Sequence, residues 1–445
     1  MRSPALKTTA ALSLFAPFAI AGTSSPKSPV PPAPPAENPL SFAGGRIVFD
    51  VENRTRFEWR ENNFDFDDSV DALTDDAWMQ NRFRLGLLLK PADWLRFYFQ
   101  GQDAQEMFSD RPDVPGVMGA EGDNPFDLRQ AWVEIGDPKK CSWSVKAGRQ
   151  VLLYGDQRLV GPWDWSALSR SFDAVKLRYD HGDGLWVDAF VSSVVHPDDS
   201  GFDESDRDSI FSGIYAHVPG WGPQETEFFL YHLKDDDRND DFFTLGTHVK
   251  STPEALGPWD YEAGFAFQAG TAGGHDLQAC AGYAEVGYTF NQPWKPRVGL
   301  EYSYASGDSN AADGDQGAFQ NLFPSNHGYY GFMDLFSWSN IHDAVLHLSA
   351  APLPKLTAEL DLHAFWLADT ADAWRRANAT TAVRPADSSA SSFAGAELDF
   401  VLTWAVSKNL SLAAGYSHFF AGGYLDDTGA QDDADFVYCF STIKF

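Results

Sequence analysis

Between positions 355 and 367 the chain reads Lys355-Leu356-Thr357-Ala358-Glu359-Leu360-Asp361-Leu362-His363-Ala364-Phe365-Trp366-Leu367. Apolar and polar side chains alternate through this segment, as they do in a β-strand with one apolar and one polar face. The same alternation recurs about eighteen times along the chain, with acidic loops and short turns between the repeats. The sequence therefore predicts an all-β fold, a transmembrane antiparallel β-barrel of about 18 strands with a polar, water-filled interior.

The first predicted strand shows why the polar faces point to a lumen. One face holds Ile47, Phe49, Val51, Thr55, Phe57 and Trp59, and the other holds Arg46, Asp50, Glu52, Arg54, Arg56, Glu58 and Arg60. So many charges would be costly to bury against a dry core, because each unpaired charge loses its hydration. A water-filled interior removes that cost.

The length of the chain fits one large barrel. The sequence has 445 residues, of which 44% are hydrophobic and 15% aromatic. No run of 18 apolar residues occurs, which argues against membrane-spanning helices. Short connections rich in Pro, Gly or Asp alternate with longer ones, as the short periplasmic turns and long extracellular loops of outer-membrane barrels do. We expect one barrel domain over 45–445, ending on the aromatic residue Phe445.

The N-terminus is typical of an exported protein. Arg2 and Lys7 precede an apolar stretch from Thr8 to Ile20, and small residues surround Ala21. This order predicts a secretory signal peptide over 1–21. The proline-rich segment that follows predicts a disordered spacer over 22–44.

The basic residues are concentrated in the first part of the chain, and many fall on predicted lumen faces: Arg54, Arg56, Arg82, Arg84, Arg96, Lys146, Lys176 and Arg178. Guanidinium groups in a pore attract anions and can bind carboxylates through two hydrogen bonds. These residues are therefore candidates for a conduit that carries an anionic solute. The alternative is that they pair with lumen carboxylates and brace the barrel wall, and both roles can hold for different residues.

The acidic excess bears on the partners. The formal net charge of −30 argues against nucleic acid. Acidic clusters fall in the predicted outer loops at 198–208, 235–241 and 426–435, where carboxylates could hold Ca²⁺ or link through divalent cations to lipopolysaccharide. No EF-hand pattern occurs, which favours solvated loops.

Catalytic and cofactor signatures are missing from the sequence. The three cysteines, Cys141, Cys280 and Cys439, are scattered and form no metal or redox motif. No common hydrolase or metalloprotease motif is present. The sequence predicts no catalytic residue, metal site or cofactor, with an outer-membrane enzyme as a remaining alternative.

The central part of the chain holds motifs that are more specific than the strand pattern: Gly148-Arg149-Gln150, Tyr154-Gly155-Asp156-Gln157-Arg158-Leu159-Val160-Gly161, Asp164-Trp165, Arg170-Ser171-Phe172-Asp173-Ala174, Tyr304-Ala305-Ser306-Gly307-Asp308, Leu322-Phe323-Pro324-Ser325-Asn326-His327, Tyr330-Gly331 and Asp334. In these motifs the chain resembles the alginate export family of bacterial outer-membrane β-barrel proteins. The resemblance covers the expected barrel, roughly residues 46–445.

The resemblance implies an eighteen-stranded barrel that passes a polyuronate outward through an Arg-lined lumen. Carried over to this chain, Arg129, Arg149, Arg158 and Arg170 would line or constrict the passage. The alternative is structural, with Arg158 or Arg170 paired to Asp156, Asp164 or Asp173 to fix a loop. The segment at His327 is a second open case, either a binding element or a loop latch.

These observations together predict an outer-membrane channel for an anionic polysaccharide, an alginate-like polyuronate, most consistent with export. The main alternative is a porin for uptake of small solutes or oligosaccharides, and a further one is a barrel sealed by its loops. The expected partners are the polysaccharide, outer-membrane lipid and lipopolysaccharide, and periplasmic secretion components.

Overall fold

The computed structural model describes residues 39–69, 75–110, 123–137, 142–198 and 201–445. The predicted signal peptide, most of the predicted spacer and Cys141 lie outside these residues. Cys280 and Cys439 are free thiols. In the described part of the chain, no helix is long and apolar enough to cross a membrane.

Eighteen strands form one closed antiparallel barrel, as the alternation predicts. They are β2 (Ile47–Glu61), β3 (Asp76–Ala92), β4 (Leu95–Met107), β5 (Asn124–Ile135), β6 (Trp143–Gln150), β7 (Phe172–Asp180), β8 (Trp186–His196), β10 (Ser209–Pro219), β11 (Gln224–Asp235), β12 (Asp240–Ser251), β13 (Trp259–Ala272), β14 (His275–Thr289), β15 (Arg297–Ala305), β17 (Ile341–Leu353), β18 (Leu356–Trp366), β21 (Phe393–Trp404), β22 (Leu410–Ala421) and β23 (Ala434–Lys444). Five short strands lie outside this set: β1 (Ser41–Phe42), β9 (Glu204–Ser205), β16 (Asp315–Gln316), β19 (Trp374–Arg375) and β20 (Ala382–Arg384). The helical pieces are η1 (Ala43–Gly45), η3 (Asn326–Gly328) and α2 (Gly423–Thr428).

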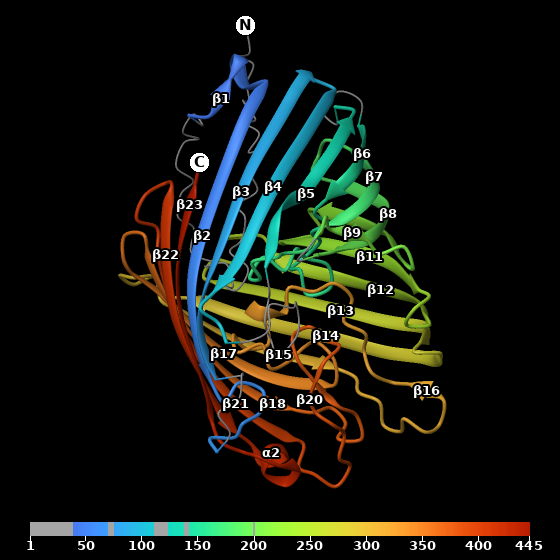
Figure 1. Ribbon diagram of the computed structural model, residues 1–445, viewed down its shortest axis with the longest axis vertical. Coiled ribbons are helices and arrows are strands. Elements are labelled where there is room, and N and C mark those ends of the chain that lie inside the picture. The colour runs from blue at the N-terminus through green and yellow to red at the C-terminus, as the bar shows by residue number, and fades with distance from the viewer. Residues whose placement is uncertain (1–38, 70–74, 111–122, 138–141, 199–200) are drawn as a thin grey trace, which may run out of the picture.

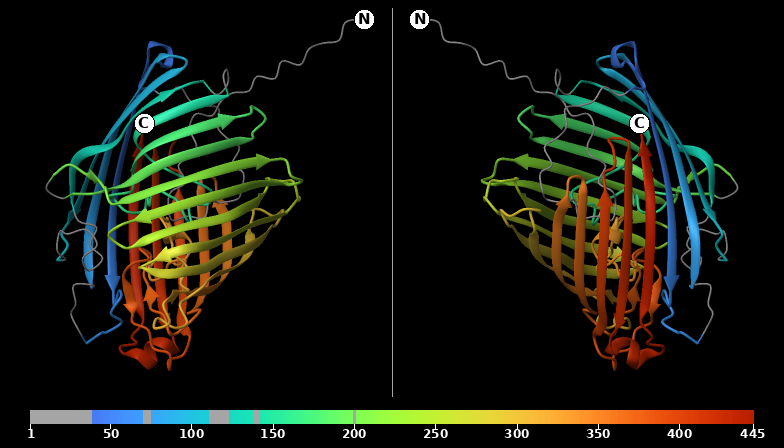
Figure 2. Two further views of the ribbon diagram at one scale, coloured as in Figure 1. Left: turned by 90° about the vertical axis from the view of Figure 1, so that its right-hand side faces the viewer. Right: turned by 90° about the vertical axis from the view of Figure 1, so that its left-hand side faces the viewer.

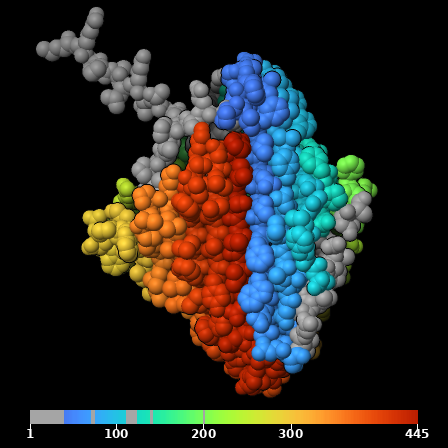
Figure 3. All heavy atoms as spheres, turned by 60° about the vertical axis from the view of Figure 1, so that its left-hand side comes forward, coloured from blue at the N-terminus to red at the C-terminus, as the bar shows by residue number. Residues whose placement is uncertain are grey.

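The barrel closes where its first and last strands meet. β2 pairs with β23 along a ladder that runs from Glu52 opposite Lys444 to Glu61 opposite Asp435. The terminal Phe445 extends this seam, because its backbone exchanges hydrogen bonds with Val51 at 3.0 and 3.2 Å. Figure 3 shows the blue first strand lying directly beside the red last strands. Closure gives each described barrel strand a neighbour on both sides.

Most connections alternate in length as predicted, although short turns at the loop end join β11 to β12 and β13 to β14. Short turns join the strands at the end where β1 and the C-terminus lie, and the longer connections reach the opposite end, where α2 lies (Figure 1). The strands are strongly tilted across the barrel (Figure 2). The long connections therefore gather at one mouth, the one that outer-membrane barrels turn to the cell exterior.

The strand faces are reversed relative to a soluble protein, and the predicted faces are confirmed. On β2, Arg56 is 1% exposed while its neighbour Phe57 is 40% exposed. On β18, Glu359 and His363 are buried, while Leu362 lies on the outside. Apolar side chains face outward because lipid covers them, and charged ones face inward.

The interior is more filled than an open water-filled tube. The connection between β6 and β7 (151–171) and most of the one between β15 and β17 (306–340) fold into the barrel and bury most of their side chains, whereas 309–315 are exposed. Aromatic residues of the wall, including Tyr215 and Tyr231, pack with these segments in one continuous core. We call 151–171 the first inner segment and 306–340 the second inner segment.

Candidate functional site

The two inner segments are joined to each other across the lumen. Val160 and Phe323 form a parallel bridge. The Phe323 amide donates to the Leu159 carbonyl at 2.9 Å, and the Gly161 amide donates to the Phe323 carbonyl at 2.8 Å. The segments therefore form one body inside the barrel, although about 150 residues separate them in sequence.

Guanidinium groups of the basic wall hold the first inner segment. Arg54 donates to the carbonyls of Asp164 and Trp165 at 2.7 and 2.6 Å. Arg82 donates to the Asp164 carbonyl at 3.0 Å, and Arg84 donates to the Asp164 carboxylate at 2.9 Å. Arg129 lies 3.5 Å from the same carboxylate. Several charge-assisted contacts thus converge on one short stretch of backbone.

The arginines around Asp164 hold its carboxylate in the ionised form. Its burial raises its pKa, but the guanidinium groups of Arg84, Arg82 and Arg129 outweigh burial and hold the pKa well below the ordinary 3.8. The carboxylate is therefore ionised at neutral pH, and it neutralises part of the positive charge of the wall.

Trp165 links the basic wall to the second inner segment. The Arg56 guanidinium lies 4.0 Å from the centre of the Trp165 ring, a cation–π contact. The His327 ring stacks on the indole of Trp165 at 3.8 Å, and its Nδ1 contacts the Asp334 carboxylate at 3.0 Å. These contacts favour the interpretation of the His327 segment as a loop latch.

Carboxylates of the opposite wall hold the second inner segment through its backbone N–H groups. The Met333 amide donates to Glu397 of β21 at 2.9 Å, and the Phe332 amide donates to Asp399 of the same strand at 3.4 Å. Arg60 of β2 donates to the Met333 carbonyl at 2.9 Å. The basic wall therefore binds mainly carbonyls, and the acidic wall binds mainly amides.

Arg158 anchors the first inner segment on the acidic side. Its guanidinium lies 2.9 Å from Asp156 and 2.7 Å from Glu301 of β15. It also lies over the rings of Tyr283 and Tyr329, at 3.9 and 4.3 Å from their centres. Arg158 thus takes the structural role that was left open by the sequence.

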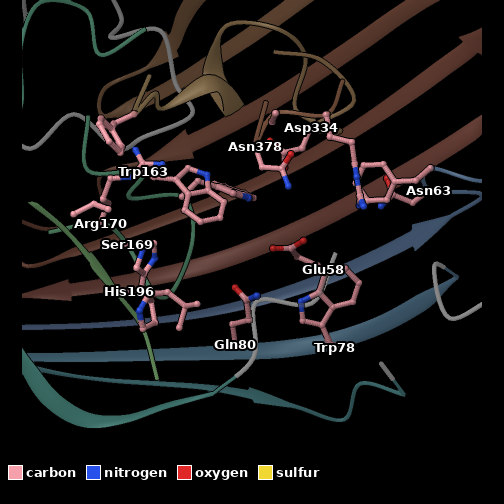
Figure 4. A pocket seen from close by; sticks show the side chains of 18 of the residues that line it. Glu58, Asn63, Trp78, Gln80, Trp163, Ser169, Arg170, His196, Asp334 and Asn378 are labelled. Carbon is pink, nitrogen blue, oxygen red and sulfur yellow. The ribbon is translucent and has the colours of Figure 1, made fainter. Parts of the chain in front are cut away.

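A cavity of about 380 Å³ lies between the inner segments, the wall formed by β2 and β3, and the loop that contains β19 and β20. Figure 4 shows Trp163, Ser169 and Arg170 on one side and Asn63 and Asp334 toward the other. Rings form much of its lining: Phe64, Trp78, Trp163, Trp165 and Phe323. A largely aromatic lining with a few polar groups is typical of a small-ligand site.

Two arginines of this cavity lie away from carboxylates. Arg170 donates from Nη1 to the carbonyls of Gly161 and Pro324, both at 3.0 Å. Burial lowers the pKa of Arg170 to about 10. Arg376 lies over the Phe64 ring at 4.1 Å, and its Nε is buried with no hydrogen-bond partner among the described residues. Burial, followed by the charge of Arg60, lowers the pKa of Arg376. These two cations are the least compensated positive charges of the cavity.

The carboxylates that line the cavity, Glu58 and Asp334, already have basic partners. Glu58 pairs with Arg56 at 2.5 Å and with Arg60 at 3.4 Å. Burial raises the pKa of Asp334, but His327 and Arg60 lower it by more, so the pKa lies below the ordinary value. The acids are thus neutralised by partners other than Arg170 and Arg376.

The structure brings only part of the predicted basic set together. Arg54, Arg56, Arg82, Arg84 and Arg129 surround the first inner segment, as described above. Nearer the short-turn end, Lys176 and Arg178 pair with Asp188 at 3.2 and 2.6 Å. Two more residues lie apart in that region, Arg96 with Glu134 at 3.2 Å and Lys146 over the Trp132 ring at 4.1 Å.

Arg149 is the exception to the predicted lumen placement. It lies opposite Asp173 in the β6–β7 ladder, on the same face as the exposed Val145 and Val175. Its guanidinium donates to Asp173 at 3.0 and 3.1 Å. This face is the outward one, so Arg149 fastens the strand pair near the loop mouth and stands apart from the interior cluster.

Sequence reasoning missed several residues of the cavity, above all Trp163 and Arg376. Both lie in irregular connections, where no period indicates which side chains face inward. Arg60 was placed on the charged face of the first strand, but it was not included among the conduit residues.

One group of described side chains has the spacing of a metal site. Asp156, His248 and Glu262 offer ligand atoms within 4.8 Å of one another. Both His248 nitrogens already contact carboxylates, Glu227 at 2.6 Å and Glu262 at 3.0 Å. Ion pairs therefore account for this group, which ties the first inner segment to β12 and β13.

Comparisons with known proteins agree with this architecture. Residues 46–438 match the family described as alginate export. Among solved structures, the barrel is similar to Pseudomonas aeruginosa OccK2 (OpdF), with a TM-score of 0.61 and 14% identity over 90% of this chain and 97% of that chain. OccK2 in complex with glucuronate gives a TM-score of 0.60 and 12% identity, over 90% and 98% of the two chains.

A third similar structure is P. aeruginosa OpdK with vanillate, with a TM-score of 0.58 and 12% identity over 89% of this chain and 98% of that chain. No curated protein matches the chain. At identities this low, the similarity to solved structures speaks for the fold alone.

Proposed function

The chain belongs to the alginate export family, and we propose that it passes an anionic polysaccharide, an alginate-like polyuronate, outward through the basic part of its interior. The protein is a β-barrel of the bacterial outer membrane with the architecture of a channel. What remains a proposal is the cargo, the direction of transport and the part played by individual residues.

The cluster of guanidinium groups around the first inner segment carries this proposal. Arg54, Arg82 and Arg84 bind carbonyl oxygens and the carboxylate of Asp164. A polyuronate also presents hydrogen-bond acceptors along its length, on its hydroxyls and carboxylates. The inner segment therefore occupies the groups that would receive the polymer, and its withdrawal would expose them to the lumen.

Transport of this kind needs weak and repeated contacts, because a single tight site would stop the chain from moving. The basic wall supplies several guanidinium groups on neighbouring strands. Arg129 is one of these groups, and its Nε has no hydrogen-bond partner within the described chain. Transport at this component would be passive, with periplasmic secretion components delivering the polymer.

One observation favours a second function, the uptake of a small acidic solute. The cavity of about 380 Å³ suits a ligand of one or two sugar units better than a long polymer. The solved structures of similar fold include complexes with glucuronate and vanillate, both small carboxylates. In this alternative the inner segments act as a selective constriction.

Deletion of the protein in the bacterium that makes it separates the two functions. An exporter predicts loss of the surface polymer and its accumulation in the periplasm, with recovery when the gene is restored. Normal surface polymer together with poor growth on an acidic sugar would contradict export and support uptake.

A further inference from the structure

We propose that the cavity between the inner segments and the β2–β3 wall binds one acidic sugar unit, with Arg376 pairing with its carboxylate and Arg170 adding positive charge to the same lining. The inference rests on the proposed function for the class of cargo. It goes beyond it in assigning a specific equilibrium binding site, distinct from the basic wall that contacts Asp164.

The charge of the site calls for an anion. The side chain of Arg376 makes no hydrogen bond or ion pair to any described residue, and its guanidinium lies over the Phe64 ring at 4.1 Å. Arg170 uses Nη1 for the two carbonyls, which leaves Nε and Nη2 without an acceptor in the described chain. A partly buried guanidinium without a counter-ion is costly, and a bound carboxylate would supply the counter-ion that Arg376 lacks.

The lining of the site suits a sugar ring. Trp163 and Phe323 lie beside Arg170, with its guanidinium carbon 5.9 and 5.7 Å from their ring centres. The Arg376 guanidinium carbon lies 4.1 Å from the centre of the Phe64 ring. Aromatic faces next to guanidinium groups offer an apolar surface for C–H groups and ionic hydrogen bonds for a carboxylate. A uronic acid carries both.

The two arginines come from separate connections, so the ligand would bridge them. Arg170 closes the first inner segment, while Arg376 lies between β19 and β20. The Arg376 connection is joined to the second inner segment by the Ala377 amide, which donates to the Asp334 carbonyl at 3.0 Å. A ligand in the cavity would therefore link the loop mouth to both inner segments.

The test is calorimetric titration of the refolded full chain in detergent with galacturonate and with galactose, its neutral counterpart. We expect one site for galacturonate and at least about ten-fold weaker binding of galactose. Arg376→Gln should weaken galacturonate binding at least about ten-fold, because charge-assisted hydrogen bonds are lost. Equal binding of both sugars, or unchanged binding in Arg376→Gln, would overturn the proposal.

Arg375→Gln is the matched control. Its guanidinium already pairs with Asp372 at 2.8 Å, so the same loss of charge one residue away should leave galacturonate binding unchanged. Arg170→Gln is a second test, but Arg170 also supports the backbone of both inner segments. The Arg376 side chain makes no such hydrogen bonds, so the Arg376→Gln variant should fold. Its binding of galacturonate can therefore be compared directly with that of the wild type.

Two further arms identify the source of the ligand and separate this inference from the proposed function. If trigalacturonate binds about ten-fold tighter than the monomer, the ligand of the site is the end of a polymer chain. If the two bind equally, the ligand is a free acidic sugar. Either result supports the site. Ion-current block by oligouronates in Arg376→Gln tests transport independently. If oligouronates block the current and Arg376→Gln binds galacturonate as tightly as the wild type, the channel is upheld and the site is overturned. If Arg376→Gln loses galacturonate binding and oligouronates do not block the wild-type current, the site is upheld and the channel is overturned.

Discussion

At the scale of single residues, Arg158 shows how one side chain fixes an irregular segment. It is 3% exposed and contacts Asp156 and Glu301, so its removal would leave Glu301 buried without its strongest partner. We predict that Arg158→Met lowers stability by about 3–5 kcal/mol. The midpoint of thermal unfolding of the refolded barrel measures this loss.

Lys234→Met is the control for that substitution. Lys234 is half exposed and pairs at 3.1 Å with Asp236, which is also exposed. Such a surface pair contributes about 0–1 kcal/mol, so the midpoint should barely move. Equal effects of the two substitutions would contradict the role assigned to Arg158.

Asp164 should make the stability of the folded protein depend on pH. Its pKa in the folded protein lies well below the ordinary 3.8, because the guanidinium groups outweigh burial. The stabilisation is therefore fully present above the ordinary pKa and is lost as the pH falls through the folded value. We predict that Asp164→Asn destabilises the protein at neutral pH and that its difference from wild type shrinks only at acidic pH.

Unfolding in urea at a series of pH values measures this difference. Asp426→Asn, at an exposed position of α2, should match the wild type throughout. A difference between wild type and Asp164→Asn that changed near neutral pH would contradict the assignment.

At the scale of elements, the inner segments should control the width of the passage. A barrel of ~16–18 strands leaves an aqueous channel when nothing fills it. We predict that replacing 157–168 with a short Gly-Ser linker raises single-channel conductance several-fold, because the strand ladders do not depend on this segment. Conductance in a planar bilayer and heat-modifiable migration on a gel are the two measurements.

Shortening the β11–β12 turn, 236–239, provides the control for that change. This turn lies at the barrel rim and should leave conductance unaltered. An unchanged current after replacement of 157–168, with the barrel still folded, would contradict the view that the inner segments constrict the lumen.

The elements also show what sequence reasoning can predict. The strands, the closure and the inward charged faces of β2 and β18 followed from the two-residue period, because lipid demands an apolar outer face at every second position. The filling of the lumen did not follow, since the inner segments have no period. Long-range contacts such as Trp165 with His327 determine their path.

The candidate site was predictable only in part, for the same reason. The arginines of β2 and β3 were found because strand periodicity gives their direction. Arg376 was missed because its neighbours in an irregular connection give no such signal. Arg149 was expected in the lumen from its motif, yet its register opposite Asp173 places it on the outer face.

At the scale of the whole molecule, the barrel has two electrically different halves that hold one internal body. Strands near β2 and β3 supply guanidinium groups to the first inner segment, and β21 supplies carboxylates to the second. This polarity would let a chain of net charge −30 offer the basic path that the proposed function requires.

The most direct test is ion current through the refolded protein in a planar bilayer, with an oligouronate and then a neutral oligosaccharide of equal length added. The account predicts concentration-dependent block by the oligouronate and little or none by the neutral oligomer. Equal block by both, or an open channel that the oligouronate does not affect, would contradict an anionic-polysaccharide conduit.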